Sequence, residues 1–537
     1  MTGEDQWRAA VEADSEGAEG QLELGAELMG QRRFAEALEC FRRAHDLGAH
    51  GFLVDFGLGS ALLDTGQDAA AIVELERAAA LQPRDAGVRQ NLAKAQYRLG
   101  LVDQAVADFR AALAVNDDAL HRSALATVIP GAPSATHADV LAARRAFAEN
   151  DLPSPRFRFP PERSPGPLRV GYLSSFFESA NWMKPVWGLV NAHDRTGFAV
   201  HLLSDATEEE CAAAGYRPDP RDAFVAIRGL DNERAAERIA AAELDLLVDL
   251  NGYSAVGRLP VVAFRPARAV AAWFNHFATS GMTTYDCLIG DSVVVHADEE
   301  TYFTERIERV SGTYLTFDVA YAVPPVEPAP ARRNGHVTFG CFASQYKLTP
   351  QVVRAWAAIL DGAPEAELLV KNRTMQAECN RVSLLQRFAE HGVDPARITL
   401  EPGAPHYDYL AAYSRVDVAV DPFPYNGGTT TSEALWQGVP VLCFDGDRWA
   451  ARQGASLLRA AGLDEFVAHD EADYIARGVQ LGRGFADERM TMRARLAASS
   501  MMDTAAFARE LESIYRRVAG LSHVLGSDAD PDGPATR

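Results

Sequence analysis

Apolar residues in the first part of the chain repeat with a period of 34 positions. Each copy holds a leucine, an alanine, a bulky apolar residue and a second alanine: Leu24, Leu58 and Leu92; Ala37, Ala71 and Ala105; Phe41, Leu75 and Phe109; and Ala44, Ala78 and Ala112. Gly66 and Gly100 mark the same turn in the second and third copies. Small residues where two helices touch, at this period, are typical of the tetratricopeptide repeat (TPR). We therefore predict an α-solenoid over residues 20–118.

This solenoid predicts a binding surface. A single helix pair cannot bury its own apolar face, so stacked repeats share one continuous core and present a concave surface. We expect that surface to recruit a protein or peptide. A spacer or a dimerising surface is the alternative, because solenoids serve these purposes too. The pattern leaves a homodimer open.

Strand-like and helix-like patterns alternate from residue 168 onward. Short apolar runs predict strands at 168–173, 199–203, 244–250 and 270–274, and a helix-forming segment covers 232–242. A second series predicts strands at 336–342, 366–370, 397–400, 416–420 and 439–443, with helices at 350–361, 378–391, 406–414, 431–437, 449–461 and 504–518. Alternation of this kind implies two parallel sheets covered by helices, each forming a doubly wound α/β domain. Ligands bind such sheets at the carboxyl ends of the strands, so we expect a cleft between the two domains.

Proline-rich stretches separate these parts. Prolines are dense at 152–167, after a helical stretch at 138–148, and again at 323–330. The expected organisation is an N-terminal segment at 1–19, repeats at 20–118, a helical connector and linker at 119–167, a first α/β domain at 168–322, a linker at 323–335, a second α/β domain at 336–526 and a disordered tail at 527–537.

The chain is acidic, with 47% hydrophobic residues, 23% charged residues and a formal net charge of -22. A negative surface argues against broad binding of nucleic acid or anionic membranes, since both need positive charge. The start of the chain has no basic region followed by an apolar core, and no apolar run approaches the length of a membrane span. Six scattered cysteines suit neither a zinc site nor a disulfide scaffold. We therefore expect a cytoplasmic protein without a membrane span.

The stretch 421–440 is the strongest candidate for chemistry, because it joins a buried strand to a helix. Gly427 and Gly428 allow a ligand to approach the backbone closely. Thr430 and Glu433 have the spacing of a capping box, with Thr430 as the N-cap of the helix. The first helical amides and the positive end of the helix dipole then form an anion site. Proline-rich turns with Gly and Thr also end strands where no ligand binds, which is the alternative interpretation.

Lys347 follows the strand at 336–342, and we expect it at the same edge of the sheet as the loop at 421–440. We hypothesise that its ammonium binds a phosphate oxygen while the amides near Gly428, Thr429 and Thr430 hold the others. The alternative for a lysine after a strand is a solvated charge. The sequence contains no G-x-x-x-x-G-K-[ST] loop, and 171–175 has one glycine where a dinucleotide motif needs three.

Together with the repeats, five motifs resemble the O-GlcNAc transferase (OGT) and SPINDLY family. These motifs lie at 170–175, 248–253, 279–281, 342–347 and 426–430, and the resemblance covers residues 20 to about 520. It implies a GT-B fold and a bacterial-type protein glycosyltransferase. Such an enzyme moves a sugar from a nucleotide donor to a Ser or Thr hydroxyl with inversion, and needs no metal or other cofactor.

The resemblance also implies roles for individual residues. Those at the donor are Lys347, Tyr346 and Ser344 near the diphosphate; Asn426, Gly427, Gly428, Thr429 and Thr430 in the phosphate loop; Glu433 at the ribose; and Ala404 and His406 at the base. Asp249 and Asn251 match a polar pair that reaches the cleft from the first α/β domain.

The charge that develops on the leaving group during transfer predicts the mechanism. Displacing a nucleotide diphosphate from the anomeric carbon builds negative charge on the leaving oxygen, which Lys347 and the helix N-terminus would stabilise. His276, Asp249 and Tyr346 are the candidates for the general base. A histidine beside a strand end is often structural, and Asp249 would alternatively orient Asn251 and the following turn.

The chain departs from the family at several positions. Gly428 and Tyr409 stand where animal members have histidines, Ala180 stands near the place of another, and 274–278 replaces a more usual Gly-Tyr-Pro-Gly. These departures leave the sugar and the nucleotide open. The segment 445–447, Asp-Gly-Asp, has the form of the metal-binding motif of metal-dependent glycosyltransferases, but a turn after the preceding strand explains it better.

We predict a protein O-glycosyltransferase that uses UDP-GlcNAc, with the repeats presenting the acceptor. One alternative keeps the fold but uses another donor, such as a CMP-linked nonulosonic acid, on a dedicated acceptor such as flagellin. A second alternative is an inactive binding or sensor protein. The replaced histidines favour that alternative, whereas Lys347, Thr429 and Thr430 oppose it.

Overall fold

The computed structural model describes residues 17–160, 165–484 and 489–521. These residues form two compact units. The first contains the residues up to 135, 336–404 and 478–484, and the second contains 136–335, 405–477 and the residues from 489 onward. The first unit therefore combines the repeats with the beginning of the second α/β segment. The expected disordered tail at 527–537 lies outside the described residues.

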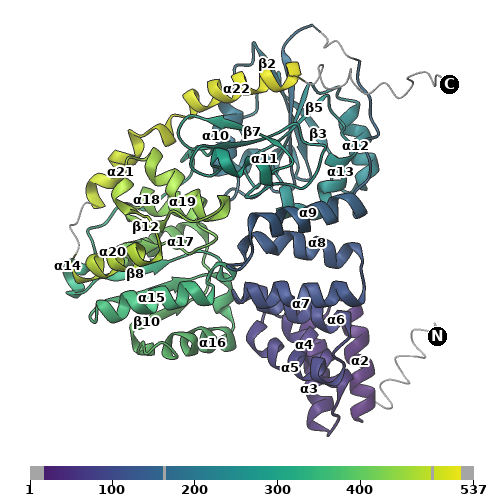
Figure 1. Ribbon diagram of the computed structural model, residues 1–537, viewed down its shortest axis with the longest axis vertical. Coiled ribbons are helices and arrows are strands. Elements are labelled where there is room, and N and C mark those ends of the chain that lie inside the picture. Colours follow the sequence, from purple (N-terminus) through teal and green to yellow (C-terminus); the bar gives the residue numbers. More distant parts are fainter. Residues whose placement is uncertain (1–16, 161–164, 485–488, 522–537) are drawn as a thin grey trace, which may run out of the picture. The chain divides into compact units, whose positions relative to one another are not determined.

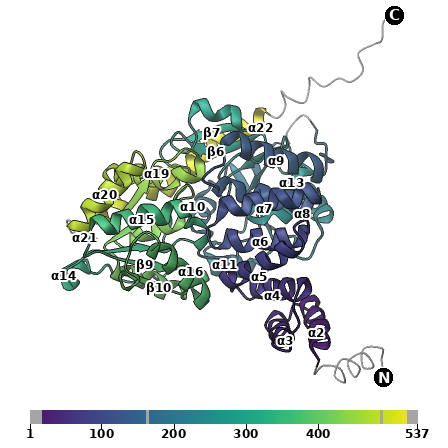
Figure 2. The same ribbon diagram turned by 60° about the horizontal axis from the view of Figure 1, so that its bottom comes forward.

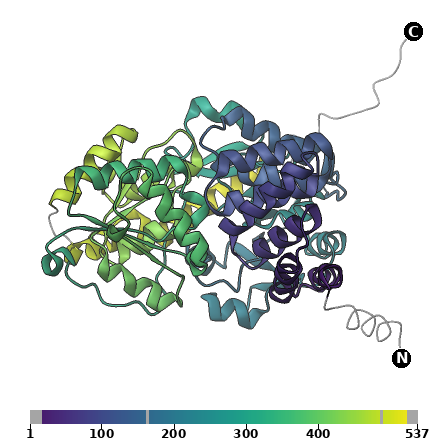
Figure 3. The same cartoon turned by 90° about the horizontal axis from the view of Figure 1, so that it is seen from below.

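Three helix pairs form the repeats of the first unit (Figure 1). They are α2 (Ala18–Gly30) with α3 (Phe34–Asp46), α4 (Phe52–Asp64) with α5 (Asp68–Leu81), and α6 (Ala86–Arg98) with α7 (Val102–Val115). Figure 2 shows α2 and α3 side by side, and in Figure 3 the dark purple helices of this pair are seen nearly end-on. The six repeating alanines are fully buried, as expected for small residues at helix contacts. The predicted solenoid is therefore confirmed.

The turn inside each repeat needs a left-handed backbone. Gly66 and Gly100 have φ of +76° and +83°, and Arg32 occupies the equivalent place in the first copy with φ of +62°. A side chain disfavours this conformation by about 1–2 kcal/mol. The sequence pattern identifies the two glycines, and the structure adds the strained arginine.

The last repeat packs on the α/β part of the same unit. The rings of Tyr97 and Tyr346 stack with centroids 5.0 Å apart. Arg387 donates to the carbonyls of Leu99 and Leu348, both at 2.9 Å. Gly100 lies so close to the Leu348 carbonyl that a β-carbon would overlap it. The repeats are thus fixed to the segment that carries Lys347.

The α/β part of the first unit contains three parallel strands in the order β10-β9-β8. Its elements are β8 (Thr338–Cys341), α15 (Pro350–Gly362), β9 (Glu367–Lys371), α16 (Glu378–Ala389) and β10 (Ile398–Glu401). The predicted strands and helices lie within one or two residues of these bounds at most ends. The remaining strands of this second sheet, β11-β12-β13, belong to the second unit.

The second unit contains a seven-stranded parallel sheet in the order β3-β2-β1-β4-β5-β6-β7. Its strands are β1 (Leu168–Ser174), β2 (Phe198–Ser204), β3 (Ala223–Ala226), β4 (Leu246–Asp249), β5 (Ala269–Ala272), β6 (Cys287–Asp291) and β7 (Arg306–Val310). The sequence pattern predicts β1, β2, β4 and β5 and misses the other three. Two helices precede the sheet in the chain: α8 (Ala119–Val128), which belongs to the first unit, and α9 (His137–Asp151). The helices that cover the sheet include α10 (Lys184–Ala192), α11 (Glu208–Ala214), α12 (Asn232–Ala240) and α13 (Leu259–Ala263).

The rest of the second unit continues the α/β alternation. Its elements are α14 (Ala331–Asn334), α17 (His406–Ala411), β11 (Val418–Val420), α18 (Thr429–Trp436), β12 (Val441–Phe444), α19 (Trp449–Ala460), β13 (Val467–Ala468), α21 (Arg489–Ala497) and α22 (Thr504–Leu521), while α20 (Glu471–Arg483) runs across the division between the units. The last helix, α22, returns to the first sheet and packs on α10 (Figure 1). There Glu512 bonds His193 at 2.9 Å and Tyr172 donates to Tyr515 at 3.2 Å, so a buried polar network fixes the helix. None of the described helices is long and apolar enough to cross a membrane.

The turn glycines provide a test of how the repeats are held. We expect Gly66→Ala to lower the free energy of unfolding by about 1 kcal/mol, because only the backbone is strained there. Gly100→Ala should cost about 1–3 kcal/mol more, since its β-carbon also meets the Leu348 carbonyl. Arg32→Gly should be stabilising. Thermal midpoints compare the three variants, and equal midpoints for the two alanine variants would contradict the packing described here.

Candidate active site

The loop between β11 and α18 is held from within. Asp421 accepts a hydrogen bond from the Gly427 amide at 2.7 Å. The fully buried Asn426 donates through its side-chain Nδ2 to the Pro422 carbonyl at 2.8 Å. Its backbone amide donates to the Ala450 carbonyl, also at 2.8 Å. These bonds fix the loop without using the amides that follow Gly427.

The first turn of α18 corrects the expected cap. The helix begins at Thr429 with Gly428 as its N-cap, so Thr430 is not the N-cap and no capping box forms with Glu433. The hydroxyl of Thr431 donates to the Gly427 carbonyl at 3.0 Å, and that of Ser432 donates to the Gly428 carbonyl at 3.2 Å. The backbone is thus already helical before Thr430, and helices leave their first amides without internal partners.

The open amides make this helix end suitable for an anion. Within the described ranges, no residue accepts a hydrogen bond from the amides of Gly428, Thr429 or Thr430, and all three residues are partly exposed. The helix dipole places partial positive charge at the same point. These three amides and the helix dipole therefore favour the binding of a phosphate at this helix end.

The two glycines of the loop differ in what they tolerate. A β-carbon on Gly427 would overlap the Thr430 hydroxyl and lie 3.2 Å from Asp421 Oδ1. Gly428 has φ of -103°, which any residue adopts, and its nearest neighbour would be 3.4 Å away. Only Gly427 is required by the close approach of the chain, and Gly428 occupies a position with room for a side chain.

Glu433 lies in a buried cluster of charged and aromatic groups. Its carboxylate pairs with Lys184 of α10, and their side chains are 4% and 3% exposed. His406 Nε2 lies 2.7 Å from Lys184 Nζ and 3.0 Å from Glu433 Oε1. Lys184 also lies 4.3 Å from the centre of the Tyr321 ring. Burial lowers the pKa of Lys184, which the neighbouring carboxylate opposes.

Asp249 is the centre of a second buried cluster. It is 0% exposed and accepts from Tyr285 O–H at 2.7 Å, from the amides of Asn251 and Gly252 at 3.0 and 3.2 Å, and from His276 Nε2 at 3.1 Å. Burial opposes ionisation, but the bonds from His276 and Tyr285 hold the pKa of Asp249 below its usual range. The alternative in which Asp249 orients the turn at Asn251 is therefore what its hydrogen bonds show.

Two atoms beside Asp249 lack partners among the described residues. Asn251 accepts from the Ser175 amide at 2.8 Å, but its Nδ2 donates to no protein atom there. His276 uses Nε2 for Asp249, and its Nδ1 is buried without a partner. Unpaired buried polar atoms are uncommon, and these two follow β4 and β5 at the carboxyl edge of the first sheet.

The remaining candidates lie in the first unit. Tyr346 and Lys347 belong to a short helical turn at Gln345–Lys347, after β8, and Ser344 is its N-cap residue. Lys347 Nζ is 5.8 Å from the centre of the Tyr346 ring, and this ring also stacks on that of Tyr97. Ala404 is the last residue of the 336–404 segment of the same unit. The phosphate loop, His406, Asp249, Asn251 and His276 belong to the second unit.

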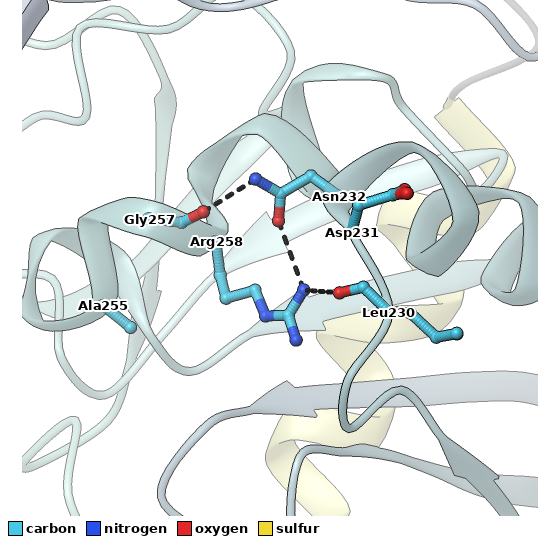
Figure 4. A pocket seen from close by; sticks show the side chains of 6 residues that line it. All are labelled: Leu230, Asp231, Asn232, Ala255, Gly257 and Arg258. Carbon is cyan, nitrogen blue, oxygen red and sulfur yellow. Dashed lines mark hydrogen bonds between the residues drawn. The ribbon is translucent and has the colours of Figure 1, made fainter. Parts of the chain in front are cut away.

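Two other polar features are accounted for locally. Asp445 pairs with Arg459 at 2.6 Å, and Asp447 pairs with Arg448 at 2.8 Å. An open hollow of about 450 Å³ is lined by residues 230–232, Ala255, Gly257 and Arg258 (Figure 4). In it Arg258 donates to the Leu230 carbonyl at 3.0 Å and pairs with Asp205, so its charge is already neutralised.

The sequence analysis did not identify Lys184, Tyr321 or Tyr285. Lys184 begins a helix with a proline after it, which gives no indication of its distant partners. One signal was present, because only four of the 52 basic residues are lysines. A buried lysine in a chain that otherwise uses arginine is a candidate for a specific role.

The two loop glycines supply a matched test. We expect Gly427→Ala to disorder the helix start and abolish nucleotide binding, because its β-carbon displaces Thr430. Gly428→Ala should fold normally and bind with at most a few-fold change. Binding is measured by calorimetry and folding by circular dichroism, and wild-type binding by Gly427→Ala would contradict the loop geometry.

The comparisons with known proteins agree with this architecture. The model of glycosyl transferase family 41 matches residues 134–327 and 331–511. A probable UDP-N-acetylglucosamine--peptide N-acetylglucosaminyltransferase SPINDLY of Solanum lycopersicum is 32% identical over 367 residues, which are 66% of this chain and 39% of the relative. The corresponding protein of Arabidopsis thaliana is 32% identical over 365 residues, covering 67% of this chain and 40% of that one. The chain thus spans about two fifths of the length of these curated relatives.

A solved structure matches nearly the whole chain. The O-GlcNAc transferase of Thermobaculum terrenum, in a mutant form, has a TM-score of 0.80 and 28% sequence identity, and the match covers 96% of this chain and 99% of that one. The predicted fold class is therefore confirmed, with a helical repeat region followed by the two parallel sheets of a GT-B glycosyltransferase. On the extent of the family match, the chain belongs to glycosyl transferase family 41.

Proposed function

We propose that the chain is a protein O-glycosyltransferase that transfers GlcNAc from UDP-GlcNAc to Ser or Thr hydroxyls of a protein held by the repeats. The observation that carries the proposal is the open start of α18, where no described residue accepts a hydrogen bond from the amides of Gly428, Thr429 or Thr430. The names of the relatives, which specify UDP-N-acetylglucosamine and peptide, support the donor and the acceptor class.

In the proposed mechanism, the start of α18 binds the donor diphosphate. The amides and the hydroxyls of Thr429 and Thr430 hold phosphate oxygens, and Lys347 contributes a full positive charge. The acceptor hydroxyl oxygen forms a bond to the anomeric carbon while the bond from that carbon to the phosphate oxygen breaks, with inversion. Negative charge grows on the leaving oxygen, so these groups bind the transition state more tightly than the ground state. The diphosphate charge is met in this way without a metal.

The hydroxyl proton passes to a base, for which we propose His276. When Nε2 donates to Asp249, the neutral ring carries a lone pair at Nδ1, the atom that has no partner in the part of the chain that the structure describes. A carboxylate that orients an imidazole in this way is the arrangement of known hydrolase triads. Asp249 is then a positioning residue, because it is fully buried and committed to four hydrogen bonds.

Lys347 provides the first test of this proposal. We expect Lys347→Ala to lower turnover of UDP-GlcNAc by roughly a hundredfold or more, as for the loss of one preorganised donor. The thermal shift given by UDP should also be lost, since a ligand stabilises the state that binds it. Arg354→Ala, an exposed cation on the next helix, is the control and should behave as wild type.

A panel of nucleotides separates the alternatives. Shifts and turnover with CMP-linked sugars alone would replace the donor and keep the reaction class. Nucleotide binding without turnover on any acceptor would identify a sensor, and the absence of any shift from UDP, GDP or CMP would overturn the proposed function.

The general base is tested with three variants. We expect His276→Phe to lower kcat by about 100-fold or more, since a phenyl ring cannot accept the hydroxyl proton. Asp249→Asn should also destabilise the protein. The new side-chain amide would face the backbone amides of Asn251 and Gly252, which are donors, and it would lose the pairing of the carboxylate with the His276 ring. A loss of kcat in Tyr346→Phe, with His276→Phe active, would assign the base to the tyrosine instead.

A further inference from the structure

Lys184 occupies an unusual position for a cation. Its side chain is 3% exposed, although it is the first residue of α10. An ammonium has three N–H donors and no acceptor. In Lys184 these donors have Glu433 Oε1, His406 Nε2 at 2.7 Å and the face of the Tyr321 ring as partners. Its donors are therefore all directed to protein groups, and Lys184 acts through its neighbours rather than on a ligand.

The contacts leave defined atoms of the neighbours available. Both contacts to Glu433 fall on Oε1, so that among the described residues Oε2 has no donor. Both contacts to His406 fall on Nε2, and Nδ1 has no partner in the same set. His406 is 22% exposed, so its ring reaches the surface of the cluster. One carboxylate oxygen and one ring nitrogen thus remain for a ligand.

The contact of Lys184 with His406 Nε2 bears on the tautomer of the ring. If the charged ammonium donates to Nε2, that atom carries the lone pair and the single ring proton lies on Nδ1. Without that ammonium, Nε2 would instead carry the proton and donate to Glu433 Oε1, which is 3.0 Å away. The same ammonium also neutralises the charge of the buried carboxylate.

We propose that Lys184 is the positioning residue of the nucleoside pocket, holding His406 as an Nδ1–H donor toward a carbonyl oxygen of a pyrimidine base and Glu433 Oε2 as the acceptor for a ribose hydroxyl. This inference rests on the proposed function, because it assumes that the donor nucleoside lies against His406 and Glu433. It adds that Lys184, which does not contact the ligand, determines how both His406 and Glu433 form hydrogen bonds with it. Donor recognition then depends on a buried lysine of the first α/β segment.

The test uses Lys184→Met, with Lys371→Met as a matched control. Lys371 is also buried and pairs with Glu401 at 3.2 Å, so the control removes a buried lysine from a carboxylate elsewhere. In protein labelled with ¹⁵N-histidine, and with the His406 signal assigned from His406→Gln, we expect Nδ1–H in wild type and in the control. Lys184→Met should move the proton to Nε2. Unchanged His406 signals in Lys184→Met, or Nε2–H in wild type, would overturn the inference.

Affinity gives the second readout. We expect Lys184→Met to raise the Kd for UDP about tenfold or more, with KM for the donor rising more than kcat falls. The double variant Lys184→Met with Glu433→Gln removes both buried charges and guards against misfolding. It should bind UDP more weakly than Glu433→Gln alone, but by a smaller factor than Lys184→Met weakens the wild type, because only the effect of Lys184 on His406 is left to lose. Wild-type affinity in folded Lys184→Met would overturn this inference alone, whereas failure of the wild type to bind any nucleotide would overturn the proposed function.

Discussion

The hydrogen bond from the Gly427 amide to Asp421 is the constraint on which the candidate site depends. It turns the chain after β11 so that α18 begins at Thr429, and no residue in the described ranges accepts from the amides of Gly428, Thr429 or Thr430. Asp421 is itself fixed, because Tyr474 donates to its carbonyl at 3.1 Å. The packing of β11 and α18 thereby produces an anion site from backbone atoms, which needs no particular side chain beyond the glycine.

Buried charge organises the rest of the site. Lys184 with Glu433, and Asp249 with its four donors, are each enclosed and each satisfied by specific partners. Removing one member of such a group leaves an uncompensated buried charge. The group is therefore stable only with all its members in place. The atoms left over, at Asn251, His276, His406 and Glu433, are few and fixed in place, as preorganised recognition requires.

Much of this fold follows from local pattern. The period of 34 positions requires stacked helix pairs, and apolar runs such as 168–173 identify central strands, because burial on both faces removes polar residues from them. β7 was missed because this edge strand carries polar residues, as Arg306–Val310 shows. β3 was missed because it has only four residues, Ala223–Ala226, none of which is buried. β6 was missed although it is apolar, because its five residues end in Gly and Asp.

The start of α18 was misplaced because the hydroxyl of Thr431 bonds backward to Gly427, and sequence spacing does not distinguish this from a cap at Thr430. Lys184 and Glu433 are brought together only by tertiary packing, so no local pattern could have paired them.

A crystal structure of the chain with UDP tests the central claim most directly. The account expects the diphosphate to accept hydrogen bonds from the amides at Gly428, Thr429 and Thr430 and to contact Lys347, with the nucleoside against His406 and Glu433. UDP bound elsewhere, for example in the hollow at Arg258, with the start of α18 left empty, would contradict it.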